Sequence, residues 1–309
     1  MKNRLLVSSV WLLALLVCCN PAPPVKHINF IVASDMGRRG ESEQQTIADL
    51  MGRDVTASDI DFMAIAGDPI HDQGVTSITD EEWQLKIEQV YTAESLHQIP
   101  WYVISGNHEY RGNVQAILDY SDVSERWNAP ARYFSIEKPV GKEQQKVLFV
   151  FIDTAPLIDK YRYEEGYSDA GEQNMERQLF WLDSTLVASD GRWKIVVGHH
   201  PIYAYTDKED TERSDMQERV GAILENRKAD FYISGHIHNF QYIKPEGKTV
   251  NYIVNSSASL SRNVQPIEGT VFCNGDPGYT KFAVSADSLW FSFVNHTGET
   301  LYRHKMGKK

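Results

Sequence analysis

Short apolar segments that end at a glycine beside Asp, Asn or His recur along this 309-residue chain, and they constrain its fold more than any other feature. The segments alternate with longer amphipathic stretches, which is the pattern of an α/β fold. In such folds the carboxyl ends of the strands converge on one edge of a sheet, where ligands usually bind. Polar side chains that are far apart in the sequence are therefore expected to meet at that edge.

The alternation predicts the following elements. Strands are expected at 27–33, 62–66, 101–104, 147–152, 194–197, 231–233 and 252–254, and three more at 282–284, 289–294 and 300–303 close a sheet. Helices are expected at 41–53, 80–97, 113–121, 171–188 and 212–227. No repeat or internal linker is visible after Pro24, so we expect a single domain over residues 27–309.

The first 19 residues have the pattern of an export signal. Lys2 and Arg4 precede a short apolar run at 5–17, which is too short to span a bilayer comfortably. Cys18 and Cys19 follow, and residues 20–26 form a Pro-rich spacer. Residues 16–19 resemble a bacterial lipobox, with Cys19 the favoured site of lipidation and Cys18 left open. We expect an exported lipoprotein in the periplasm or on the outer membrane, the alternative being a plain cleaved signal.

Charge and cysteine content limit the possible partners and ligands. The formal net charge is −11, so a nucleic-acid backbone is not an expected partner. An acidic surface does not attract phosphate compounds either, so any phosphate site needs a local source of positive charge. Cys273 is the only cysteine beyond the signal, which excludes an internal disulfide and a thiolate metal cluster. A metal would have to be held by oxygen and imidazole.

Five motifs carry the candidate ligands, and each follows a predicted strand. They are Ser34-Asp35-Met36-Gly37, Gly67-Asp68, Gly106-Asn107-His108-Glu109, Gly198-His199-His200 and Gly235-His236-Ile237-His238. Each motif alone is weak, because Gly-Asp after a strand is more often a turn or a helix cap. Five such motifs in order are hard to obtain by chance, and glycine lets the backbone turn and approach closely. His236 and His238 can both bind one centre only if their loop bends, since alternate residues of an extended chain point to opposite sides.

With these motifs the sequence resembles the calcineurin-like metallophosphoesterases, and among them the small purple (tartrate-resistant) acid phosphatases. The resemblance runs from about Ile28 to about Arg303 and includes the flanking segment Phe151-Ile152-Asp153-Thr154. It implies a four-layer α/β/β/α sandwich of two mixed sheets. It also implies two divalent or mixed-valence metal ions, with Fe, Zn and Mn the candidates.

The resemblance assigns a role to most of the motif residues. Asp35, Asp68 and His238 would bind the first metal. Asp68 would bridge to a second metal held by Asn107, His199 and His236. His108 would face the substrate as a phosphate-binding group and proton donor, which makes His108 and Asp68 the candidate catalytic residues. His200 would either contact the substrate or lie behind the ligands, and the sequence does not separate these two roles.

One position departs from the purple acid phosphatases. They carry a metal-binding tyrosine three residues after the bridging aspartate, and its charge transfer to ferric iron gives the colour. His71 stands at that position here, and the first motif lacks the Asp-x-His of other metallophosphoesterases. His71 is therefore expected to supply an imidazole to the first metal, with packing or solvent exposure as the alternative. A neutral imidazole favours a divalent ion over ferric iron, so a colourless enzyme is expected.

The predicted activity is hydrolysis of phosphate monoesters by water that two metal ions activate. A phosphodiesterase acting on nucleotides or lipid head groups is the first alternative, and a catalytically silent metal-binding scaffold is the second. The expected partner is a small phosphate ester, with membrane contact only through the lipid anchor, and the chain is expected to be a monomer. Arg38 and Arg39 could meet phosphate or lie solvated, and Tyr161 and Tyr167 could line a pocket or cover loops.

Overall fold

The computed structural model describes residues 27–141, 145–208 and 210–308. The predicted signal at 1–19, with Cys18 and Cys19, and the spacer at 20–26 lie outside the described residues. Within the described ranges, no helix combines the length and apolar character that crossing a bilayer requires.

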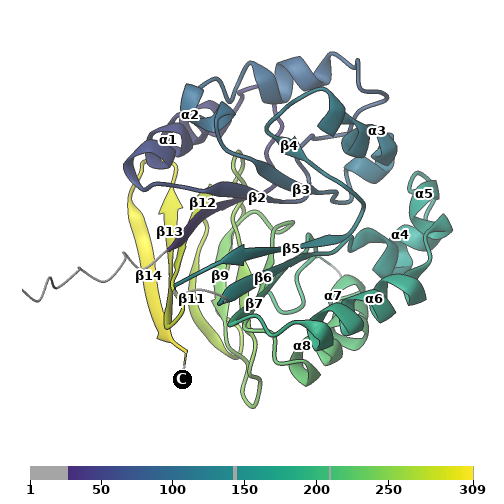
Figure 1. Cartoon of the computed structure of the whole chain (residues 1–309). Helices are drawn as coiled ribbons and strands as arrows, with labels where there is room; N and C mark the ends of the chain where they lie inside the picture. The colour runs from purple at the N-terminus through teal and green to yellow at the C-terminus, as the bar shows by residue number, and fades with distance from the viewer. Residues whose placement is uncertain (1–26, 142–144, 209, 309) are drawn as a thin grey trace, which may run out of the picture.

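Two seven-stranded mixed sheets form the centre of the molecule (Figure 1). The first has the order β14-β13-β12-β1-β2-β3-β4, with β1 Ile28–Ala33, β2 Phe62–Ala66, β3 Trp101–Ile104, β4 Trp127–Asn128, β12 Gly278–Val284, β13 Ser288–Asn295 and β14 Thr300–Gly307. The second has the order β11-β9-β10-β8-β7-β6-β5, with β5 Phe134–Pro139, β6 Lys146–Phe151, β7 Trp193–Val197, β8 Phe231–Ser234, β9 Phe240–Ile243, β10 Asn251–Val254 and β11 Thr270–Asn274.

Alternation along the strands creates three apolar layers. In β1, Phe30 and Val32 face the second sheet, and Phe30 stacks on Phe62 with ring centroids 5.0 Å apart. Ile31 and Ala33 point the other way, into the layer beneath the helices. Because successive side chains of a strand point to opposite faces, one apolar run supplies both layers.

Helices cover the two outer faces, as Figure 1 shows. The first sheet is covered by α1 Gln44–Ala57, α2 Glu94–His97 and α3 Val114–Asp119. The second is covered by α4 Asp159–Tyr163, α5 Ser168–Glu172, α6 Met175–Ala188, α7 Thr211–Met216 and α8 Ala222–Asn226. This arrangement is the four-layer α/β/β/α sandwich, so the predicted fold class is confirmed.

Several predicted elements differ in detail. The helix expected at 80–97 is replaced by a π-helical turn at Gln84–Glu88 and the separate helix α2. Leu96 is buried five residues after buried Tyr91, which on one helix would place them about 140° apart. The chain therefore leaves helical geometry at Ala93, whose backbone is extended, and both side chains reach the core.

Other differences follow from local capping and from short elements. The helix expected at 171–188 begins at Met175, because the Asn174 side chain accepts a hydrogen bond from the Arg177 N–H and caps it. The helix expected at 212–227 contains a π-helical turn at Gln217–Gly221 between α7 and α8. Strands β4, β5, β9 and β11 and the short helices α4 and α5 were not predicted.

The strand order places the five motifs at one edge. β1, β2 and β3 are parallel neighbours in the first sheet, and β7 and β8 are parallel neighbours in the second. Their carboxyl ends precede Asp35, Asp68, Asn107, His199 and His236. Both sheets therefore deliver their polar loops to the same side of the sandwich.

Candidate metal centre

Asp35, His71 and His238 form one buried group of potential ligands. One ligand atom from each lies within 4.8 Å of the others, and Asp35 Oδ1 is 3.2 Å from His238 Nε2. Asp35 comes from the loop after β1, His71 from the loop after β2 and His238 from the loop after β8. The backbone N–H of His236 donates to Asp35 Oδ2 at 2.9 Å, which holds the carboxylate in place.

Asp68 lies at the centre of the wider cluster. Its Oδ2 atom is 3.1 Å from His199 Nε2, 3.5 Å from His71 Nε2 and 3.8 Å from His108 Nε2. Its Oδ1 atom accepts a hydrogen bond of 2.9 Å from the backbone N–H of His108. One carboxylate therefore faces both the group that contains His71 and the group that contains His199.

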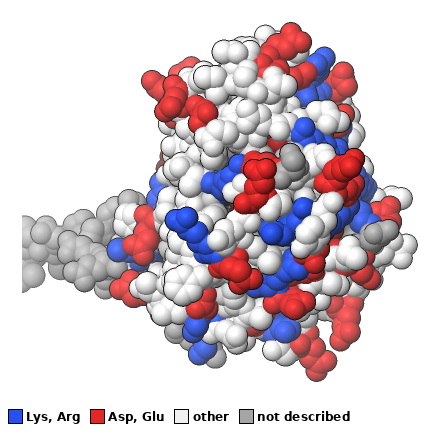
Figure 2. Space-filling model, turned by 90° about the vertical axis from the view of Figure 1, so that its right-hand side faces the viewer, with Lys and Arg blue, Asp and Glu red and all other residues white. Residues whose placement is uncertain are grey.

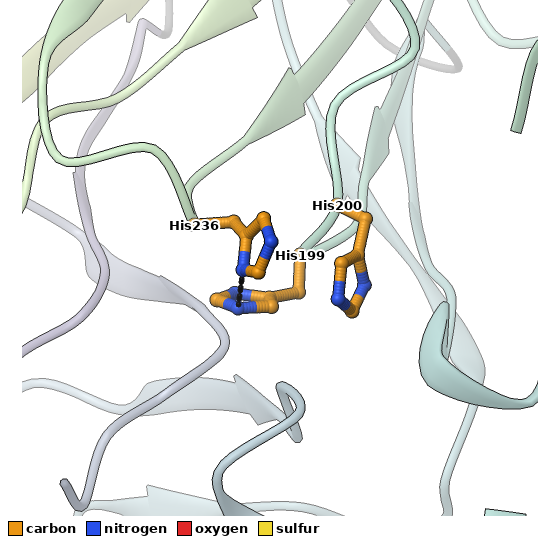
Figure 3. Close-up of side chains that lie close together, drawn as sticks. All are labelled: His199, His200 and His236. Carbon is orange, nitrogen blue, oxygen red and sulfur yellow. Dashed lines mark hydrogen bonds between the residues drawn. The ribbon is translucent and has the colours of Figure 1, made fainter. Parts of the chain in front are cut away.

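His199, His236 and Asn107 form the second group. His236 Nδ1 is 3.2 Å from His199 Nε2, the contact drawn as a dashed line in Figure 3, and Asn107 Oδ1 is 3.3 Å from His199 Nε2. His199 Nδ1 lies 2.9 Å from the carbonyl oxygen of Ala66. This bond holds a proton on Nδ1, so Nε2 is the nitrogen that presents a lone pair to the cluster once its own proton is lost.

The backbone of the loops is bent at the candidate ligands. Asp35, Asp68, His236 and His238 all have positive φ, at 54°, 49°, 71° and 62°. Non-glycine residues adopt this conformation rarely, and it concentrates at functional sites. The two bends in residues 236–238 bring both histidines to the cluster, as the motif required.

Glycine permits the close approach of the loops at two positions. Gly67 has a φ of 82°, and a β-carbon there would collide with the His199 ring. A β-carbon at Gly106 would collide with the Asp68 carboxylate. Any other residue at either position would push apart the groups that meet around Asp68.

The donor set fits metal ions better than it fits a closed hydrogen-bond network. The seven predicted ligands are each 0–4% exposed, namely Asp35, Asp68, His71, Asn107, His199, His236 and His238. Among the described residues, Asp35 Oδ1, both ring nitrogens of His71 and His238 Nδ1 have no hydrogen-bond partner. Buried polar atoms without partners are costly, and a cation bound between them would satisfy them.

The protonation states also suit cation binding. Burial alone would raise the pKa values of Asp35 and Asp68, but the surrounding histidines outweigh it and hold both well below the usual range. Burial lowers the pKa of His71 well below its ordinary value, and this ring is neutral. Burial opposes protonation of His199, but Asp68 raises its pKa to about 9, so a cation that binds there displaces a proton.

His200 lies behind this cluster and does not line the adjacent pocket. Its Nδ1 is 2.7 Å from Thr154 Oγ1, and its ring centroid is 4.8 Å from that of Tyr161. Figure 3 shows its ring beside those of His199 and His236. Of the two roles that the sequence left open, this position favours support of the ligands over contact with substrate.

Glu212 and Lys208 contact the cluster, although no local signal in the sequence marks them. His236 Nε2 is 2.9 Å from Glu212 Oε2 and 2.8 Å from Lys208 Nζ. One ring nitrogen can serve only one of these partners, and donation to the carboxylate leaves the lone pair of Nδ1 facing the cluster. Glu212 lies in the first turn of helix α7, which the sequence predicted without showing what it packs against.

A pocket of about 550 Å³ opens above these groups. Asn107, His108, His236 and His238 reach its floor. Arg38, Tyr161 and Tyr167 belong to its lining, whereas Arg39 lies outside it and pairs with Glu82. Arg38 and the two tyrosines thus reach the pocket, a role that the sequence had left open for each.

The family follows from a direct comparison. The family model for calcineurin-like phosphoesterases matches residues 28–240, more than half of the chain. The chain belongs to this family. Purple acid phosphatase 4 of Arabidopsis thaliana is 31% identical over 92% of this chain and 85% of its own.

Two further proteins are more distantly similar to this chain. Human tartrate-resistant acid phosphatase type 5 is 24% identical over 91% of each chain. The solved structure of GAP50, described as the anchor in the inner membrane complex of Plasmodium, has a TM-score of 0.78 and 23% identity over 92% of this chain and 89% of its own. That last likeness shows the fold alone. The predicted resemblance to purple acid phosphatases is confirmed.

Proposed function

We propose that this phosphoesterase hydrolyses phosphate monoesters at a centre of two metal ions. The observation that carries the proposal is the position of Asp68, whose Oδ2 atom lies between the His71 side and the His199 side of one buried cluster. A carboxylate in this position can be shared by two cations. The cluster forms the base of a pocket, where a substrate phosphoryl group can reach it.

The two groups of side chains define the proposed ligands. Asp35, Asp68, His71 and His238 would hold the first ion, and Asp68, Asn107, His199 and His236 the second. When bound, two such ions neutralise phosphoryl oxygens and lower the pKa of water. Oxygen and imidazole donors suit Fe, Zn and Mn, so the identity of the metals is a matter for measurement.

His108 is the proposed proton donor to the leaving group. Its Nδ1 lies 2.5 Å from the carbonyl oxygen of Asp72, which fixes a proton on Nδ1. Its Nε2 faces the cluster, and the residue lines the pocket. We propose that His108 binds the phosphoryl group and donates the Nε2 proton to the departing oxygen.

A two-substrate assay tests the activity. We expect turnover of p-nitrophenyl phosphate to exceed that of bis-p-nitrophenyl phosphate, and a chelator to remove both activities. Faster cleavage of the diester would show that the activity is that of a phosphodiesterase and not that of a monoesterase. If neither compound were cleaved by protein that held both metals, the chain would be a silent metal-binding scaffold.

The proposed role of His71 is tested by colour. With an imidazole in place of tyrosine, we expect wild-type protein to show no visible charge-transfer band. His71→Tyr supplied with ferric iron should gain visible absorption, because a phenolate then binds the metal. His304→Tyr, a change of an imidazole on β14 away from the cluster, is the control and should stay colourless. An iron-loaded but colourless His71→Tyr protein would exclude this position as a ligand.

A further inference from the structure

The wall of the pocket above the proposed metal ligands has a charge opposite to that of the whole chain. Five cationic side chains line it, namely Arg38, Arg111, Lys160, Lys208 and Arg262, against two acidic ones, Asp72 and Asp207. The full chain has a net charge of −11, so composition alone does not account for this set. In Figure 1, α4 and α5 beside this pocket lie at the right, and Figure 2 shows Lys and Arg side chains across the middle of that face among acidic ones.

Three of these five cations have no carboxylate partner in the part of the chain that the structure describes. Arg38 pairs with Asp72 at 3.4 Å, and Lys160 pairs with Glu212 at 2.9 Å. Among the described residues, no carboxylate oxygen lies within 4 Å of Arg111, Lys208 or Arg262. Unpaired cations in a concave site raise the local concentration of anions.

One side of the wall is preorganised by two tyrosines. The rings of Tyr161 and Tyr167 pack edge to face with centroids 4.9 Å apart. The Arg111 guanidinium lies 5.5 Å from the Tyr167 centroid and donates to the Tyr167 hydroxyl at 2.8 and 3.0 Å. Lys160 Nζ lies 5.3 Å from the Tyr161 centroid. The aromatic pair therefore holds a guanidinium and an ammonium on adjacent parts of the wall.

Arg262 reaches the same pocket from a different loop. Its backbone N–H donates to the carbonyl oxygen of His238 at 2.9 Å, which holds the backbone of Arg262 next to a proposed metal ligand, while the residue remains exposed. Arg111 lies beside the proposed proton donor, since its Nη1 is 3.3 Å from His108 Nδ1. We call Arg111, Lys160 and Arg262, the exposed cations of the wall, the cationic rim, although Lys160 also pairs with Glu212.

A monoester with one phosphate leaves the cationic rim unused. The metal cluster and His108 would take the scissile phosphoryl group at the floor, and a pocket of about 550 Å³ has room for much more than that group. A second phosphate on the leaving group would reach the wall. Its three oxygens can accept from guanidinium and ammonium donors on more than one side, whereas a carboxylate is satisfied by one Arg fork.

We propose that the cationic rim is a binding site for a second phosphate group, so that the preferred substrates are small bisphosphorylated compounds. This inference depends on the proposed function in one respect only, namely which of the two phosphate groups is cleaved. Binding can be measured without turnover, because phosphonates mimic phosphate esters and their P–C bonds are not hydrolysed.

Calorimetric titration of the metal-loaded full chain tests this inference. Propane-1,3-bisphosphonate should bind about tenfold or more tightly than propylphosphonate. The preference should shrink at about 1 M salt, where screening acts over about 3 Å. Arg262→Gln and Arg111→Gln should each reduce the preference several-fold. Arg177→Gln, which changes an exposed Arg on α6 away from the pocket, should leave it unchanged.

The possible outcomes separate this inference from the proposed function. Equal binding of the two phosphonates, or a preference that salt and both rim variants leave unchanged, would overturn the site. If 3-phosphonopropionate bound as tightly as the bisphosphonate, the assignment to phosphate would be wrong. A preference for the bisphosphonate in protein that does not cleave p-nitrophenyl phosphate would support the second phosphate site and reject the proposed hydrolase activity. Equal binding of the two phosphonates in protein that does cleave p-nitrophenyl phosphate would reject the second phosphate site and support the hydrolase activity.

Discussion

Asp68→Ala is expected to release both metal ions and to reduce phosphatase turnover to background. The Asp68 carboxylate faces both groups of proposed ligands, at 3.1 Å from His199 Nε2 and 3.5 Å from His71 Nε2. Removing it therefore weakens both sites, whereas loss of a ligand at one end, such as His238, should empty chiefly the first site. Elemental mass spectrometry of purified protein, together with turnover of p-nitrophenyl phosphate, measures both effects.

The Asp68→Ala result is informative only if the variant protein remains folded. The Asp68 carboxylate also accepts the His108 N–H and lies against several imidazoles, so Asp68→Ala removes structural contacts as well. Asp68→Asn keeps the shape and an oxygen for that N–H but removes the charge, and it should stay folded while binding metal more weakly. Asp122→Ala, at an exposed position, is the matched control for loss of a carboxylate. Full activity in metal-depleted Asp68→Ala protein would end the two-metal proposal.

The fold and the core of the site could be predicted because each rests on local sequence. Strand ends are marked by apolar runs followed by glycine, and parallel neighbours must bring those ends to one edge. This reasoning placed Asp35, Asp68, Asn107, His199 and His236 together without knowledge of the second sheet. The bends at His236 and His238 were also implied, because an extended Gly-His-Ile-His could not direct both rings to one place.

What the sequence did not predict depends on packing between distant segments. Glu212 is an ordinary acidic residue at a helix start, and only the packing of α7 against α4 brings it to His236 and Lys160. The break before α2 follows from the need to bury Leu96, which competes with local helix propensity. The cationic rim could not be predicted either, since Arg111, Lys160 and Arg262 come from three separate segments and none carries a motif.

The placement of these groups explains how an acidic chain can bind phosphate. The buried carboxylates of Asp35 and Asp68 are directed at imidazoles, and the exposed Asp72 and Asp207 of the wall are outnumbered by its five cationic side chains. The exposed Arg111, Lys160 and Arg262 line the pocket, where they can attract an anionic substrate. Net charge therefore predicts the behaviour of the surface as a whole but not that of this site.

His108→Ala is expected to keep both metals and to slow hydrolysis of alkyl phosphates by about 10²–10⁴-fold. The side chain lies beside the cluster, with Nε2 3.8 Å from Asp68 Oδ2, and is not among the proposed ligands. If it protonates the departing oxygen, the loss must depend on the leaving group. Release of p-nitrophenolate needs little help from an acid, so p-nitrophenyl phosphate should lose much less activity than glycerol phosphate.

The leaving-group dependence separates an acid from a mere phosphate-binding group. A residue that only binds the phosphoryl group would affect both substrates alike, because they share that group. His108→Gln retains a hydrogen-bond donor but cannot release a proton, so it should preserve KM better than His108→Ala while leaving kcat for glycerol phosphate low. His97→Ala, at an exposed position on α2, should change neither constant. An equal loss for both substrates would reject proton donation by His108 and leave it as a binding residue for the phosphoryl group.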